Sequence, residues 1–130
     1  MISLKTSVRI ERPIEEAFAY VSDPLRFPAW NSAVRSVRRT SSSTYEMERD
    51  LPTGRARNEL EIVVLDPPAE FAIRTTSGPT PFVYRYRLSE DGAGTLLAFD
   101  AEIQLPRIAG PAIRRGIEAN LATLVRELHG

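Results

Sequence analysis

The sequence contains no cysteine, and its one histidine is His129, next to the last residue. Without cysteine there is no disulfide framework, thiolate nucleophile or cysteine metal site. A single histidine in this position offers no base for a Ser-His-Asp arrangement, so we expect its imidazole to be solvated. No carboxylate cluster has the spacing of a metal site, and we expect neither a metal ion nor a cofactor.

An excess of one charge and a long apolar run are also missing. Lys plus Arg and Asp plus Glu number 17 each, so no overall field favours nucleic acid or an anionic membrane. The arginines are scattered and have no interleaved aromatic residues, which also disfavours nucleic-acid binding. No segment approaches the roughly 20 apolar residues of a membrane span, and the first residues lack signal-peptide character. We expect a cytoplasmic protein without membrane insertion.

What the sequence does contain is an alternation typical of β-strands. The 130 residues are 42% hydrophobic and 26% charged, which predicts a single globular domain over residues 1–130. Apolar and polar residues alternate over 2–10, and again in successive runs between 44 and 105. Turn residues separate these runs, and each run has one apolar face. We predict about seven strands in an antiparallel sheet, followed by a long amphipathic helix that ends at the C-terminus.

Two short helices are expected between the first and second strands. Pro13 ends the first strand and suits the first turn of a helix. Ser22 or Asp23 can cap a second short helix that has Pro24 at its first position. Pro28 is expected to end this helix, just before Trp30. The predicted fold class is therefore α+β.

The order of elements and the segment 13–31 resemble the START-like helix-grip superfamily, and within it the polyketide cyclase/dehydrase-like branch. The stretch 115–121 is similar to the closing helix of that family. The resemblance implies a curved antiparallel sheet wrapped around the C-terminal helix, with a cavity between them. The residues that carry the resemblance in the first segment are Pro13, Glu16, Phe18, Val21, Ser22, Asp23, Pro24, Pro28, Trp30 and Asn31.

On this fold the apolar face of each strand points inward, so inward aromatic and polar residues are candidates for ligand contact. Tyr84 and Tyr86 are either core aromatics or groups that stack on a ligand and donate hydroxyl hydrogen bonds. Asn58 and Asn120 bond either to the protein and trapped water or to a ligand. Thr75 and Arg49 share the inward face, whereas Asp100 and Glu102 point outward and are expected to be solvated. The candidate ligand-binding residues are Trp30, Asn58, Phe71, Ile73, Tyr84, Tyr86, Phe99, Ile113, Ile117 and Asn120.

Three functions are compatible with these features. The first is binding of a small hydrophobic ligand (aromatic, polyketide-like or lipid-like) in the cavity. The second is a cyclase or dehydratase that acts by confinement, with Tyr84, Tyr86 or Asn58 polarising a carbonyl. The third is a protein-interaction module, which predicts an exposed apolar patch instead of a cavity. The absence of a nucleophile–base pair favours the first. Both a monomer and a homodimer are compatible with the sequence.

Overall fold

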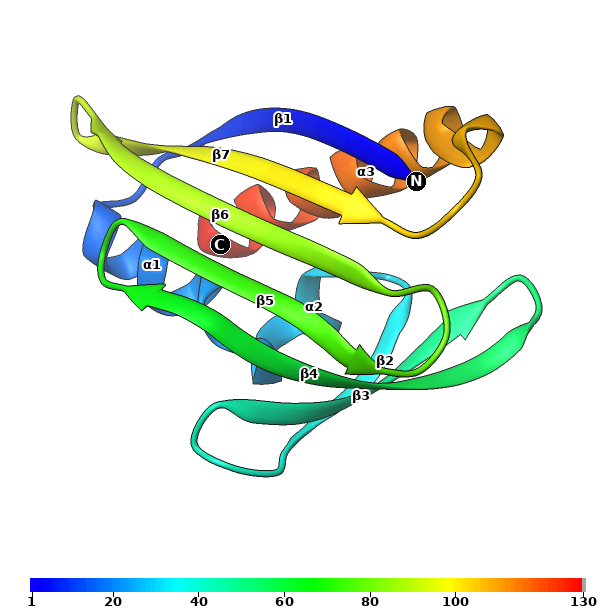
Figure 1. Ribbon diagram of the computed structural model, residues 1–130. Coiled ribbons are helices and arrows are strands. Elements are labelled where there is room, and N and C mark those ends of the chain that lie inside the picture. The colour runs from blue at the N-terminus through cyan, green and yellow to red at the C-terminus, as the bar shows by residue number, and fades with distance from the viewer. Residues whose placement is uncertain (130) are drawn as a thin grey trace.

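The computed structural model describes residues 1–129, in which seven strands form one antiparallel sheet (Figure 1). The strand order is β1-β7-β6-β5-β4-β3-β2, so the first strand pairs with the last. The predicted sheet of about seven strands is confirmed. The strands are β1 (Ile2–Ile10), β2 (Val34–Arg39), β3 (Thr44–Leu51), β4 (Gly54–Asp66), β5 (Glu70–Ser77), β6 (Phe82–Asp91) and β7 (Gly94–Ile103).

The alternation of the sequence produces two different sheet faces. On β3, Tyr45 and Met47 point inward and are each 2% exposed. Glu46, between them, points outward and lies 3.2 Å from the guanidinium of Arg38 on β2. Asp100 also points outward, as predicted, and pairs with Arg87 on β6. The outer face is therefore charged and the inner face apolar, as expected for a sheet covered on one side.

Two short helical segments follow β1, as predicted. They are α1 (Ile14–Val21) and a 3₁₀ turn η1 (Pro24–Arg26) that runs into α2 (Phe27–Trp30). The Asp23 carboxylate caps η1 by accepting a hydrogen bond from the Leu25 amide at 3.1 Å. The prediction that Pro28 ends the helix is wrong, because Pro28 lies in the first turn of α2. A proline is tolerated there because a first-turn residue needs no N–H partner within the helix.

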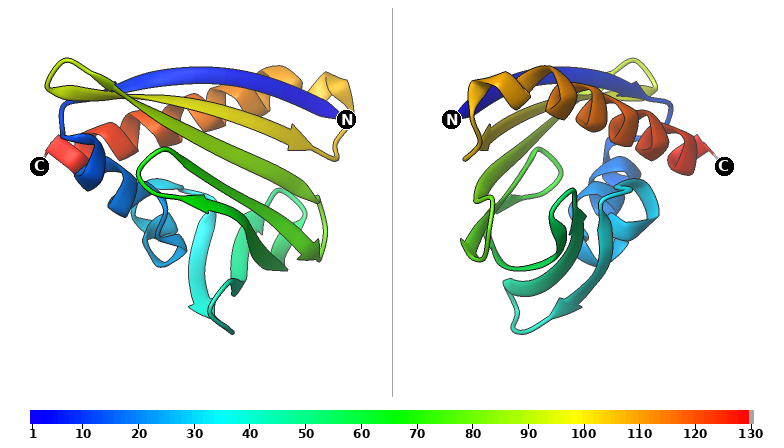
Figure 2. Two further views of the ribbon diagram at one scale, coloured as in Figure 1. Left: turned by 60° about the vertical axis from the view of Figure 1, so that its left-hand side comes forward. Right: turned by 90° about the vertical axis from the view of Figure 1, so that its right-hand side faces the viewer.

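The long helix α3 (Gly110–His129) follows the 3₁₀ turn η2 (Arg107–Ala109) and confirms the predicted closing helix. Figure 2 shows α1, α2 and α3 on the same, concave side of the curved sheet. The helix packs against β1 and α2, and its buried residues are Leu121 and Leu124. No helix within residues 1–129 is long and apolar enough to cross a membrane.

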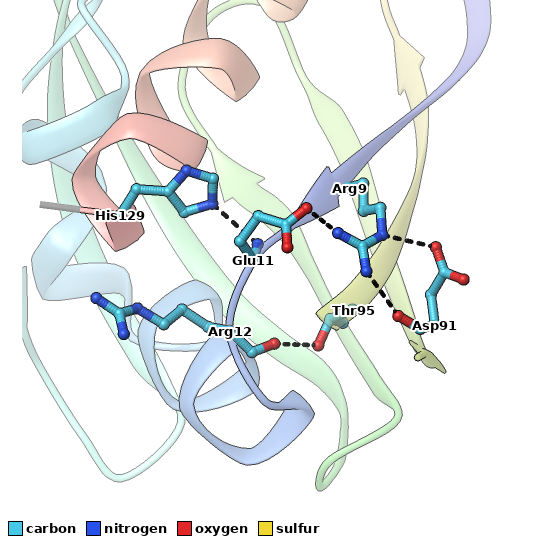
Figure 3. Close-up of polar contacts among 6 residues, drawn as sticks. All are labelled: Arg9, Glu11, Arg12, Asp91, Thr95 and His129. Carbon is cyan, nitrogen blue, oxygen red and sulfur yellow. Dashed lines mark hydrogen bonds and ion pairs between the residues drawn. The ribbon is translucent and has the colours of Figure 1, made fainter. Parts of the chain in front are cut away.

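The C-terminal end of α3 is held by the turn between β1 and α1 (Figure 3). The amide of Glu11 donates to Nε2 of His129 at 2.9 Å, and Nε of Arg12 donates to the Leu128 carbonyl at 2.6 Å. The hydroxyl of Thr95, which is completely buried, donates to the Arg12 carbonyl at 2.8 Å. The imidazole of His129 is exposed, as expected, but it is also a hydrogen-bond acceptor that helps to hold the helix end.

Candidate ligand-binding site

Aromatic side chains form a continuous cluster on the concave face of the sheet. Phe82, Tyr84 and Tyr86 alternate along β6 and therefore point to the same side. The rings of Phe82 and Tyr84 stack with centroids 4.1 Å apart, and Tyr84 meets the edge of Phe99 on β7 at 5.2 Å. Tyr86 stacks on Phe71 of β5 at 5.6 Å. The sequence predicted this shared face, and the structure brings the rings into contact.

Trp30 extends the cluster from α2 to the sheet. Its ring meets Tyr86 edge-on, with centroids 6.4 Å apart and an interplanar angle of 89°. The side chain is 4% exposed, and its indole N–H is buried without a hydrogen-bond partner within residues 1–129. An unpaired buried donor costs about 1–3 kcal/mol. Trp30 therefore closes one end of the aromatic cluster at a cost in hydrogen bonding.

Tyr84 has a strongly desolvated hydroxyl, but its side chain is partly accessible to solvent. Burial raises the pKa of Tyr84 to about 12, against an opposing effect of the Arg49 charge. Its side chain is nevertheless only partly buried, in contrast to the neighbouring Tyr86. Burial raises the pKa of Tyr86 as well, and the neighbouring Tyr84 adds to the effect. Tyr84 is therefore desolvated at its hydroxyl, yet part of its side chain stays accessible.

Arg49 and Asn58 form a buried polar cluster beside the aromatic residues. Nε of Arg49 donates to Oδ1 of Asn58 at 2.9 Å, and the two residues are 8% and 0% exposed. Nδ2 of Asn58 donates to the carbonyls of Ser77 and Pro79 at 3.1 and 2.9 Å. The Arg49 guanidinium also lies 5.4 Å from the centroid of the Phe82 ring. Burial lowers the pKa of Arg49.

The cluster fixes the loop 78–81, which joins β5 to β6. Gly78 has φ 99°, and a Cβ there would lie 2.3 Å from the Arg57 carbonyl oxygen and 2.7 Å from Nδ2 of Asn58. Only glycine allows the backbone to approach the cluster so closely with this φ angle. The sequence placed Arg49 on the inward face through the parity of β3, but it gave no sign of these loop contacts.

The candidate residues from the sequence occupy different environments. Both Oδ1 and Nδ2 of Asn58 are hydrogen-bonded within the protein. Phe71 and Ile73 are completely buried, so their contact with a ligand stays a prediction. Asn120 on α3 accepts a hydrogen bond from the Ser32 amide at 3.3 Å. Ile113 and Ile117, also on α3, are partly buried against the core.

A groove of about 590 Å³ lies on the outer face, over β1, β6 and β7. Charged side chains dominate its lining, including Lys5, Arg85 and Glu102. It therefore differs in chemistry from the aromatic concave face. Within residues 1–129, no three His, Asp or Glu side chains gather into a group that could hold a metal ion.

The curved antiparallel sheet and the long helix packed on its concave side define an α+β helix-grip fold. The family described as polyketide cyclase/dehydrase and lipid transport matches residues 1–129. The chain therefore belongs to the polyketide cyclase/dehydrase and lipid transport family.

Solved structures with the same fold come from several bacteria. A START superfamily protein from Mycobacterium smegmatis is 18% identical, with a TM-score of 0.73 over 97% of this chain and 93% of that one. A protein from Deinococcus radiodurans is also 18% identical, with a TM-score of 0.79 over 97% and 96%. A conserved protein from Geobacillus kaustophilus is 15% identical, with a TM-score of 0.82 over 98% and 95%. No match was found among curated proteins.

Proposed function

We propose that the protein binds a small hydrophobic ligand between the concave face of the sheet and α3. The observation that carries this proposal is the partial accessibility of inward-facing side chains from both sides of that space. Tyr84 and Ile62 on the sheet and Ile113 and Ile117 on α3 all pack against the core, yet none is fully buried. Apolar and aromatic walls with a few polar groups are typical of small-molecule sites.

The ligand in this proposal lies against the aromatic cluster. Tyr84 offers a partly accessible ring and a hydroxyl donor, and the buried rings of Tyr86 and Phe99 pack behind it. Aromatic pairs in such geometries add about 0.5–1.5 kcal/mol beyond their burial. The site therefore favours a ligand with a flat or flexible apolar body and at least one acceptor oxygen.

The enzyme alternative has less support from the geometry. Asn58 is a candidate for polarising a carbonyl, but both ends of its amide are engaged within the protein. Tyr84, with a pKa of about 12, is a neutral hydrogen-bond donor at neutral pH and not a base. The tyrosines therefore suit binding better than proton abstraction.

The protein-interaction alternative predicts a contiguous exposed apolar patch. The exposed large apolar side chains are instead spread over Met1, η1, β4, β7 and η2, with Ile108 of η2 the most exposed. Singly scattered apolar residues are normal on a protein surface. No observation on the described residues favours this alternative over ligand binding.

The proposal can be tested with the neutral fluorescent probe N-phenyl-1-naphthylamine, whose emission rises in apolar surroundings. We expect saturable binding to the wild-type protein. The Ile117→Trp variant fills the space between α3 and the sheet, so it should lose most of this binding. Ile113→Phe, one turn earlier on the same face of α3, is a milder second variant for the case that the first does not fold.

Glu118→Gln is the matched control, because Glu118 follows Ile117 directly and is exposed. It should bind the probe as the wild type does, and circular dichroism should show that all variants are folded. Absence of probe binding to the wild type, or unchanged binding to both filled variants, contradicts the proposed function.

A further inference from the structure

Arg49 is a buried cation that has no carboxylate partner within residues 1–129. Arginines on the outer face pair with carboxylates: Arg38 lies 3.2 Å from Glu46, and Arg57 lies 3.5 Å from Glu48. Arg49 is only 8% exposed, and the buried polar and charged residues within 1–129 include no Asp or Glu. A buried positive charge normally needs a counter-charge close by, because burial removes its hydration.

The hydrogen bonds of Arg49 leave part of its guanidinium free. Nε donates to Oδ1 of Asn58, and Nη2 donates to the carbonyls of Pro79 and Thr80 at 2.9 and 3.4 Å. Nη1 has no partner within residues 1–129, and it is not among the atoms sealed off from solvent. The three acceptors are all neutral, so they orient the group without neutralising its charge.

Within residues 1–129, the concave face has unpaired donors and no buried carboxylate acceptor. Besides Nη1 of Arg49, the partly accessible Tyr84 hydroxyl has no hydrogen-bond partner within residues 1–129, and the unpaired indole N–H of Trp30 is sealed off from solvent. The acceptors nearby are already used, because Oδ1 of Asn58 receives the Arg49 Nε–H and Oγ1 of Thr75 receives the Phe82 amide. A ligand that complements this face must bring the acceptors.

Building on the proposed function, we propose that the ligand is a carboxylic acid with an apolar body, and that its carboxylate binds Nη1 of Arg49. The Tyr84 hydroxyl is a second donor, because the Arg49 charge acts on it and the Phe82 ring contacts both residues. The apolar body then lies along Tyr84 and Phe99 toward Ile113 and Ile117 of α3. One arginine balances one negative charge, so a monoanion fits better than a phosphate dianion.

The test compares ligands that share an apolar chain and differ only at the head. Dodecanoate, dodecanol, dodecylamine and dodecyl phosphate, all kept below their micelle concentrations, compete with N-phenyl-1-naphthylamine for the wild-type protein. We expect dodecanoate to displace the probe at a concentration about tenfold or more below that of dodecanol. This factor corresponds to one charge-assisted hydrogen bond. Dodecylamine should be weaker than dodecanol, because its ammonium faces Arg49.

Two variants test whether the preference for dodecanoate over dodecanol depends on Arg49. Arg49→Leu should reduce the dodecanoate-to-dodecanol ratio to about one, since one charge-assisted bond is lost, and each displacement is referred to the variant's own affinity for the neutral probe. If this variant does not fold, Tyr84→Phe keeps Arg49 and its loop contacts and should lower the ratio by removing the second donor. Arg55→Leu is the control, because Arg55 lies on neighbouring β4 and is exposed.

These results test the carboxylate head group separately from hydrophobic binding itself. Equal displacement by dodecanoate and dodecanol overturns the carboxylate proposal and leaves hydrophobic binding intact. Stronger displacement by dodecyl phosphate than by dodecanoate also overturns it, in favour of a phosphate head. Failure of the neutral probe to bind the wild type would count against the proposed function itself.

Discussion

Nε of Arg49 lies 2.9 Å from Oδ1 of Asn58, and these two buried side chains come from neighbouring antiparallel strands. Together they hold the carbonyl of Pro79, which accepts from Nη2 of Arg49 and from Nδ2 of Asn58, both at 2.9 Å. The pair therefore connects β3, β4 and the loop 78–81 at one end of the aromatic cluster. A change in either residue affects both stability and the shape of the site.

Replacement of Asn58 by leucine should destabilise the protein. The change leaves the Arg49 Nε–H and the Ser77 and Pro79 carbonyls with fewer partners in a buried place. We expect the free energy of unfolding to fall by about 1–3 kcal/mol or more, measured by urea denaturation. Glu59→Gln is the control, since Glu59 is adjacent and exposed. Equal stability of Asn58→Leu and the wild type would show that the cluster carries no net stabilisation.

Two glycine-to-alanine changes should act in opposite directions. Gly78→Ala should lower the free energy of unfolding by about 1–3 kcal/mol, because φ is 99° and the added Cβ would meet Arg57 and Asn58. Gly116→Ala should raise it by about 1 kcal/mol, because Gly116 lies inside α3 with open space around the position. Thermal melts of both variants measure the difference, and a loss of stability in Gly116→Ala would contradict the helix geometry.

The buried hydroxyl of Thr95 should stabilise the turn that carries Arg12. Thr95→Val keeps the shape of the side chain but removes the donor to the Arg12 carbonyl. The expected loss is about 1–3 kcal/mol in the free energy of unfolding. Thr95→Ser keeps the hydroxyl and should lie between the wild type and Thr95→Val. If the serine variant is as unstable as the valine variant, the hydrogen bond is not the cause.

Alkaline pH should destabilise the fold through Tyr84. Its pKa rises from 10.0 in an exposed tyrosine to about 12 in the fold, mainly because of burial. Since the folded value is the higher one, the stabilisation by neutral Tyr84 is fully present below pH 10 and is lost as the pH rises to 12. Unfolding free energies measured across this range should fall less steeply in Tyr84→Phe than in the wild type. Parallel profiles would show that Tyr84 ionises normally.

The sequence predicted the fold far better than the site. The period-two alternation identified the inward faces of β1 and of β3 to β7, because that pattern depends only on which side of the sheet is buried. Contacts between segments far apart in the chain leave no such pattern in the sequence. The pairing of Arg49 with Asn58 and the loop 78–81, and the hydrogen bond from Glu11 to His129, depend on how the chain closes in space. Pro28 was misread because proline both ends and begins helical segments, and only the preceding 3₁₀ turn distinguishes the two cases.

The pairing of β1 with β7 has a consequence for how the chain reaches its native state. Ile2 pairs with Ile103 and Ile10 with Thr95, so β1 finds its sheet neighbour only after the intervening strands of the domain have been made. Contacts of such long sequence separation are slow to form. During synthesis β1 remains an unsatisfied strand with an apolar face, and such segments are prone to association. Folding of this domain should therefore be completed only after β7 and α3 have left the ribosome.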